Sequence, residues 1–141
     1  MTPEELKARA RRIPQEMLTQ GDLAVADEIL AADVVHQAPH TPGVEGVKQW
    51  VTTLRRAFPD LRAIVEDEVA EGDTVVQRLT LSGTHAGLFL GLPPTAARAT
   101  WQVVAIQRVG PDGKVAEHRV VADHLGLLRQ LGAIPAVGGV S

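Results

Sequence analysis

The sequence contains neither cysteine nor tyrosine. The lack of cysteine excludes a disulfide framework, a thiol nucleophile and a thiolate metal site. The lack of tyrosine removes an acid that is common in small-molecule pockets. No apolar run approaches the length of a membrane-spanning helix, and no apolar segment follows the polar N-terminus. We therefore expect a cytoplasmic protein without a membrane partner.

The composition is otherwise that of an ordinary globular domain. The 141 residues are 45% hydrophobic and 22% charged, which is enough to build a sizeable core. We therefore treat residues 1–141 as a single domain. The formal net charge of −3 disfavours nucleic acid as a partner.

Apolar spacing predicts helices in the first part of the chain. The segment Thr2–Glu5 is a helix-capping signal, and the apolar stripe that follows is interrupted at Pro14, which we expect to kink or split the helix. Gly21–Asp22 begins a second helix. Residues 34–43 are polar and rich in turn formers, and a third helix carries Trp50 on its apolar face.

After Pro59 the pattern changes to that of β-strands. Strands are predicted over residues 61–71, 74–85, 99–109 and 114–122. Helices followed by a meander of antiparallel strands indicate an α+β domain with helices on one sheet face. Neither face is purely polar, so we expect a second copy of the chain to cover the other face in a homodimer.

The alternation of side chains along the strands assigns residues to faces. We expect one face to carry Arg78, Thr80, Ser82, Trp101, Val103, Ala105, Gln107, His118, Val120 and Ala122. The opposite face is expected to carry Gln77, Leu79, Leu81, Val104, Ile106, Arg119 and Val121. One β-bulge would reverse part of such an assignment.

Several short motifs occur in order along almost the whole chain: Gln20–Leu23, Ala57–Leu61, Glu71–Asp73, Gly83–Gly87, Gly91–Thr95, Asp112–Lys114, Glu117–His118 and Asp123–Gly132. Together they resemble the SnoaL-like polyketide cyclase (ester cyclase) family, within the nuclear transport factor 2 and ketosteroid isomerase superfamily. The resemblance implies a cone-shaped α+β barrel, in which N-terminal helices pack on a curved antiparallel sheet and enclose an apolar pocket. It also implies a dimer and ring closure by intramolecular aldol addition on a polyketide ester. In that reaction an aspartate moves the proton, without metal or cofactor.

The sequence departs from this family's catalytic pattern. The resemblance places the aspartate at Val120, a histidine and a glutamine at Ala105 and Val103, and an asparagine at about His36. Limonene-epoxide-hydrolase-like proteins share the fold and use an arginine-x-aspartate pair plus a further aspartate. Here Arg78 fits the arginine, but the acids are replaced, so we do not expect water activation by the same route.

Three residues are the candidates for catalysis. His118 titrates near neutrality and can carry a proton, or it can be a structural histidine bonded across strands. His36 borders the expected pocket mouth, where it can pair with His118, contact a substrate or have no role. Arg78 can polarise a substrate oxygen or form a structural ion pair.

The predicted substrate pocket consists of Trp50, Thr80, Trp101, Val103, Ala105 and Val120. Asp123 is expected to cap the last helix and His85 to make local hydrogen bonds. His36 and His40 lack a visible third ligand, so neither a metal nor another cofactor is predicted.

The leading hypothesis is a cofactor-independent enzyme that acts on a small, apolar, oxygenated molecule by acid–base chemistry. Cyclisation, isomerisation or a related lyase step would suit such a pocket. Two alternatives remain: a non-catalytic binding protein of the same fold, suggested by Val120, and an epoxide hydrolase.

Overall fold

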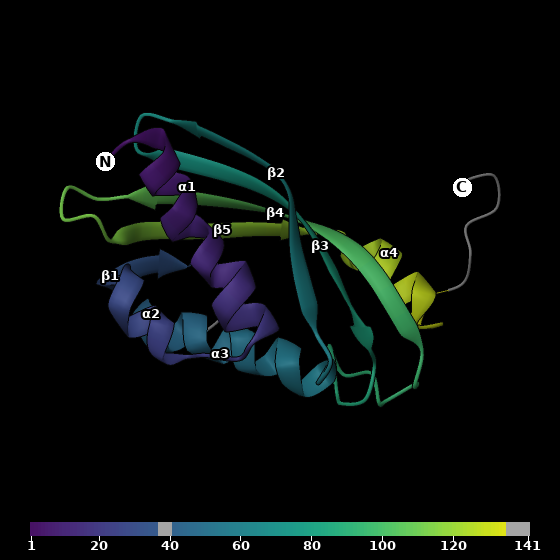
Figure 1. The fold of residues 1–141 in the computed structure, drawn as a ribbon. Coiled ribbons are helices and arrows are strands. Elements are labelled where there is room, and N and C mark those ends of the chain that lie inside the picture. Colours follow the sequence, from purple (N-terminus) through teal and green to yellow (C-terminus); the bar gives the residue numbers. More distant parts are fainter. Residues whose placement is uncertain (37–40, 135–141) are drawn as a thin grey trace.

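A curved five-stranded sheet arches over a layer of helices (Figure 1). The computed structural model describes residues 1–36 and 41–134. The strands are β1 (Leu30–His36), β2 (Arg62–Glu71), β3 (Thr74–Thr84), β4 (Arg98–Val109) and β5 (Val115–Ala122). The helices are α1 (Pro3–Arg12), the π-helix η1 (Ile13–Thr19), α2 (Ala24–Ile29), α3 (Gly43–Ala57) and α4 (His124–Gln130).

The sheet is mixed, in the order β1-β5-β4-β3-β2. The four predicted strands form the expected antiparallel part, and β1, which was not predicted, adds to it by pairing with β5 in parallel. β1 overlaps residues that we expected to form a turn. Its pairing with β5 is long-range, and no local pattern signals it. Within residues 1–36 and 41–134 the sheet does not close, and the predicted α+β cone is therefore open between β1 and β2.

The N-terminal helix begins as its sequence predicts. Thr2 Oγ1 accepts the Glu5 N–H at 3.1 Å, which satisfies one of the free donors of the first turn. α1 ends at Arg12, and Pro14 lies at the start of η1. Since proline donates no backbone hydrogen bond, the change from α- to π-helix at this point is the expected break.

The helices cover one face of the sheet, which we call the inner face. On β3 it carries Val75, Gln77, Leu79 and Leu81; on β4 it carries Trp101, Val103, Ala105 and Gln107; on β5 it carries His118. Leu79 lies opposite Val103, and Ala105 lies opposite Val120. These side chains meet apolar residues of α1, η1 and α3 in the main core.

The predicted face of β3 is wrong by one residue. The register places Arg78 opposite Val104 and Thr80 opposite Gln102, so both lie on the other side of the sheet from His118. A short hairpin turn sets the register of its two strands, but a long loop joins β3 to β4. The phase of β3 relative to β4 therefore could not be inferred from alternation.

The other side of the sheet, the outer face, carries apolar side chains among ion pairs. Val69 and Val121 are 63% and 67% exposed, and Ile106 is 39% exposed. Arg78 pairs with Asp67 across β3 and β2, and Arg108 pairs with Glu117 across β4 and β5.

The short helix α4 follows β5 and is the last helix of the described residues. Asp123 Oδ1 accepts the Gly126 N–H at 2.9 Å, which confirms the predicted cap. Gln130 Oε1 accepts the Thr100 N–H at 2.8 Å, and Gln130 Nε2 donates to the Thr100 carbonyl oxygen at 2.7 Å. These two bonds satisfy the edge of β4 where β5 has ended. Among the helices of residues 1–36 and 41–134, none is both long enough and apolar enough to span a bilayer.

Candidate functional site

Two histidines and a tryptophan from three separate elements meet at the inner face. His36 is the last residue of β1, His118 lies within β5, and the parallel register places the two opposite each other. Trp50 reaches both from α3. The ring centroids are 5.2 Å apart between the histidines, and the Trp50 ring lies 5.5 Å from His36 and 5.3 Å from His118. We call these three residues the histidine cluster.

The two histidines are in direct contact through their Nδ1 edges. His36 Nδ1 lies 3.1 Å from the His118 backbone oxygen and 3.2 Å from His118 Nδ1. His118 is only 1% exposed, whereas His36 is half-buried. Burial, with the neighbouring His36 charge as a smaller cause, lowers the pKa of His118 to about 3. Burial also lowers the pKa of His36, against the hydrogen bond from its ring to the His118 carbonyl.

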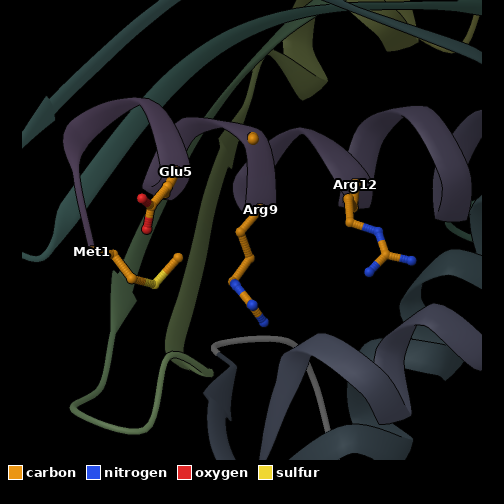
Figure 2. Close-up of a pocket in the computed structure, with 5 residues that line it drawn as sticks. Met1, Glu5, Arg9 and Arg12 are labelled. Carbon is orange, nitrogen blue, oxygen red and sulfur yellow. The ribbon is translucent and has the colours of Figure 1, made fainter.

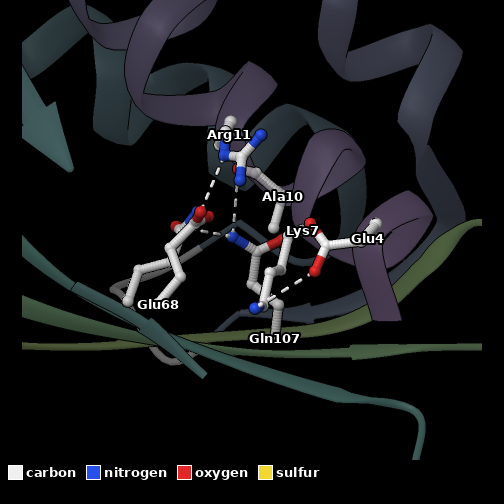
Figure 3. Close-up of polar contacts among 7 residues, drawn as sticks. Glu4, Lys7, Ala10, Arg11, Glu68 and Gln107 are labelled. Carbon is white, nitrogen blue, oxygen red and sulfur yellow. Dashed lines mark hydrogen bonds and ion pairs between the residues drawn. The ribbon is translucent and has the colours of Figure 1, made fainter. Parts of the chain in front are cut away.

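A chain of polar side chains links α1 to the inner face of the sheet (Figure 3). Arg11 Nε donates to Glu68 at 2.7 Å, and Gln77 Nε2 donates to the second oxygen of the same carboxylate at 3.0 Å. Gln107 Nε2 then donates to Gln77 Oε1 at 3.4 Å. Gln107 is the cross-strand neighbour of His118, and both glutamines are completely buried.

The contact between these two glutamines was not predicted from the sequence. Gln77 was assigned to the opposite face, and Gln107 was placed correctly but given no function. Gln107 Oε1 is buried and has no hydrogen-bond partner among the described residues. The available signal was an amide side chain within each of two otherwise apolar strands. A buried amide normally has hydrogen-bond partners, so each glutamine could have been expected to bind a polar group inside the protein.

The remaining inner wall is apolar. Trp101, Val103 and Ala105 are at most 4% exposed, and Val120 is half-buried against the core. Trp101 lies 4.9 Å from the ring of Phe58, in a second aromatic group that also includes His85 and Phe89.

Comparison with known proteins identifies the fold's relatives. Residues 8–131 match the SnoaL-like polyketide cyclase family. The chain is 35% identical over 106 residues to the aklanonic acid methyl ester cyclase DnrD of Streptomyces peucetius, covering 74% of this chain and 72% of that one. It is also 35% identical over 112 residues to the nogalonic acid methyl ester cyclase of Streptomyces nogalater, covering 75% and 82%.

Solved structures agree. TsrD from Streptomyces laurentii superposes with a TM-score of 0.88 at 30% identity, covering 95% of this chain and 99% of that one. Wild-type IdmH, a putative polyketide cyclase from Streptomyces antibioticus, gives 0.76 at 32% identity, covering 90% and 98%. The chain belongs to the SnoaL-like polyketide cyclase family.

Within this SnoaL-like domain, the structure brings together only part of the predicted site. His36, Trp50 and His118 meet, and Trp101, Val103, Ala105 and Val120 share their side of the sheet. Arg78 and Thr80 do not. Arg78 Nε binds Asp67 at 2.7 Å on the outer face, so the sequence-based placement of Arg78 beside His118 is wrong.

His85 has the local role expected for it. Its Nδ1 accepts the Thr95 N–H at 3.2 Å and lies 3.0 Å from Thr95 Oγ1, which ties the loop before β4 to the end of β3. His40 lies outside the described residues. The described residues contain no group of three or more histidine, aspartate or glutamate side chains placed to hold a metal ion.

The helical layer of the SnoaL-like domain also has surface hollows. One, of about 350 Å³, is lined by Met1, Glu5, Ala8, Arg9 and Arg12 on α1 (Figure 2). Another, of about 230 Å³, is lined by Gly21, Leu23, Val51, Thr52, Arg55 and Arg56. None of these lining residues belongs to the predicted site.

Proposed function

We propose that this protein is a polyketide-cyclase-like enzyme that acts by acid–base chemistry, without a cofactor, on a small, apolar, oxygenated molecule. The observation that carries the proposal is the histidine cluster. Two imidazoles are in contact at the edge of the inner face, beside apolar residues and two buried glutamines, and no acid of the family pattern stands at Val120. The substrate would enter an apolar pocket between Trp50 and the inner wall.

The surroundings of the histidine cluster favour proton transfer. Apolar walls exclude water, and partial charges act more strongly where water is excluded. Burial lowers the pKa of both histidines, so both are neutral at neutral pH and offer lone pairs rather than positive charge. A neutral imidazole is a suitable acceptor for a proton removed next to a carbonyl group.

The relatives suggest the substrate class. DnrD is an aklanonic acid methyl ester cyclase, and the Streptomyces nogalater relative is a nogalonic acid methyl ester cyclase. We therefore propose a polyketide ester whose ring is closed by intramolecular addition. Such a step is an isomerisation, because the proton taken from carbon returns to the new hydroxyl group.

The test is to incubate the protein with each of these two methyl esters and to separate substrate from an isomeric product by chromatography and mass spectrometry. We expect conversion by the wild type and by the control His124→Asn, which changes an exposed histidine. The double variant His36→Ala/His118→Ala should be inactive while keeping its circular dichroism spectrum. Wild-type rates in the double variant would refute the site.

A specific observation favours a second candidate, a binding protein without turnover. Val120 stands where the family resemblance places the catalytic aspartate. A binding protein would retain the ester unchanged in the same experiment. Val120→Asp would then be informative, since new turnover in that variant would show that the pocket accepts the substrate and lacked only the acid.

We further propose that a second copy of the chain covers the outer face. Its apolar side chains are exposed, and they alternate with acidic and basic groups of both signs. Asp67 and Arg78 lie on one side of this face, Glu117 and Arg119 on the other. A two-fold axis that places each acid near a base of the partner would make this surface complementary to itself.

A further inference from the structure

We infer that His36, through its Nε2 atom, is the base of this site, and that His118 is the residue that positions it. The inference rests on the proposed function, and it reverses the roles suggested by the sequence. The hydrogen-bond geometry of the histidine pair leaves the lone pair of His36 Nε2 without a partner among the described residues.

The His36 ring is in contact with the backbone of β5. A carbonyl oxygen only accepts hydrogen bonds. His36 Nδ1 lies 3.1 Å from the His118 carbonyl oxygen, so His36 Nδ1 carries the hydrogen. A neutral imidazole has one N–H, and its Nε2 is then unprotonated.

The two imidazole rings are also in contact with each other. The two Nδ1 atoms are 3.2 Å apart, the centroids are 5.2 Å apart and the ring planes differ by 13°. The rings therefore lie nearly edge to edge, and the His36 N–H can point at His118 Nδ1 as well as at the carbonyl. His118 Nδ1 accepts, which places its own hydrogen on Nε2. The reverse assignment would leave the lone pair of His36 facing the carbonyl oxygen.

The lone pair of His118 is thus occupied, and that of His36 is not. His36 Nε2 is buried and has no hydrogen-bond partner among the described residues. An unpartnered buried acceptor is rare in folded proteins and requires an explanation. His36 ends β1 and is half-buried, whereas His118 is 1% exposed, so the His36 ring is the less buried of the two.

The charges around His36 suit a base that works near neutral pH. From β5 it faces His118, which is neutral, and from α3 it faces Trp50, which carries no charge. Lys48, two residues before Trp50, is held by Asp27 at 2.8 Å. The pKa of His36 is lowered by burial, which keeps Nε2 free of a proton at neutral pH.

The chemical step then balances without a co-reactant. His36 Nε2 takes a proton from a carbon next to a carbonyl group, and the electron pair of the C–H bond moves into an enolate. The enolate carbon forms a bond to a second carbonyl carbon of the same molecule, and that oxygen takes the proton back from Nε2–H. While His36 is charged, its Nδ1–H donates to His118, which stabilises the cation.

Asparagine variants distinguish the role of His36 as the base from the role of His118 as the positioning residue. An asparagine amide reaches the position of Nδ1 but has no atom at the position of Nε2. His36→Asn therefore keeps the donor to the His118 carbonyl and loses the base, so we expect kcat to fall about 100-fold or more. In His118→Asn the amide oxygen still accepts from His36, and we expect kcat to fall less than about 10-fold by the same reasoning.

The pH profile adds a readout that a structural role would not change. In the wild type, kcat/KM should rise with pH through one ionisation below the ordinary histidine pKa and then level off. This ionisation should disappear from the residual activity of His36→Asn and persist in His118→Asn and in the control His124→Asn. If His118→Asn loses as much activity as His36→Asn, the assignment of roles is wrong.

A measurement on the wild type keeps the inference testable without any variant. Long-range ¹H–¹⁵N correlation spectra distinguish the two histidine tautomers, and we expect His36 to carry its hydrogen on Nδ1 and His118 on Nε2. Hydrogen on Nε2 of His36 would overturn the inference. Activity in the His36→Ala/His118→Ala double variant would instead overturn the proposed function, so the two failures are distinguishable.

Discussion

Acidification is expected to destabilise the wild-type protein more than a variant in which His118 is asparagine. An unfolded histidine takes up a proton below about pH 6.5. In the folded protein, burial lowers the pKa of His118 to about 3. Between these two values the unfolded chain binds the additional proton, so the free energy of unfolding falls as the pH falls, and this stability is fully present only above the unfolded pKa.

The size of the effect follows from the two pKa values. One pH unit within this window is equivalent to about 1.4 kcal/mol. From about pH 7 to about pH 5, His118 should therefore remove about 2 kcal/mol from the free energy of unfolding. Asparagine does not titrate, so the variant lacks this contribution at every pH, whatever its overall stability.

The assay is urea unfolding at both pH values, followed by circular dichroism. The wild type should lose about 2 kcal/mol more than His118→Asn, and His124→Asn, which changes an exposed histidine, should behave as the wild type. Carboxylates such as Asp60, whose pKa is lowered by hydrogen bonds from Thr84, contribute equally to all three proteins and cancel in the difference. Equal losses in wild type and His118→Asn would refute the buried, neutral state of His118.

Three further perturbations test other parts of the structure. Val121→Asp, on the outer face, should shift the protein from dimer to monomer in light scattering after size-exclusion chromatography, and an unchanged mass would contradict the proposed interface. Asp123→Ala removes the cap that binds the Gly126 N–H and should lower the free energy of unfolding by about 1 kcal/mol in urea titration. Gly87→Ala would place a methyl group against the Arg56 backbone oxygen. We expect a lower melting temperature and a free energy of unfolding that is smaller by about 1–3 kcal/mol. Unchanged stability would mean that this loop can move away.

The sequence by itself determined the features that depend on neighbouring residues. The caps at Thr2 and Asp123 and the break at Pro14 were all predictable, because each is a contact or a restriction within a few residues. The four antiparallel strands were predictable for a similar reason. Alternation and short turns are local signals, and the ordered motifs identified the family.

Only the tertiary structure decided which of these residues meet. His36 and His118 are 82 residues apart in the chain, and a parallel pairing that no local pattern signals brings them into contact. The phase of β3 depends on a long loop rather than on a tight turn, which moved Arg78 out of the site and Gln77 into it. A strand's pattern says which residues alternate, but only its register against its neighbours says which side faces the helices.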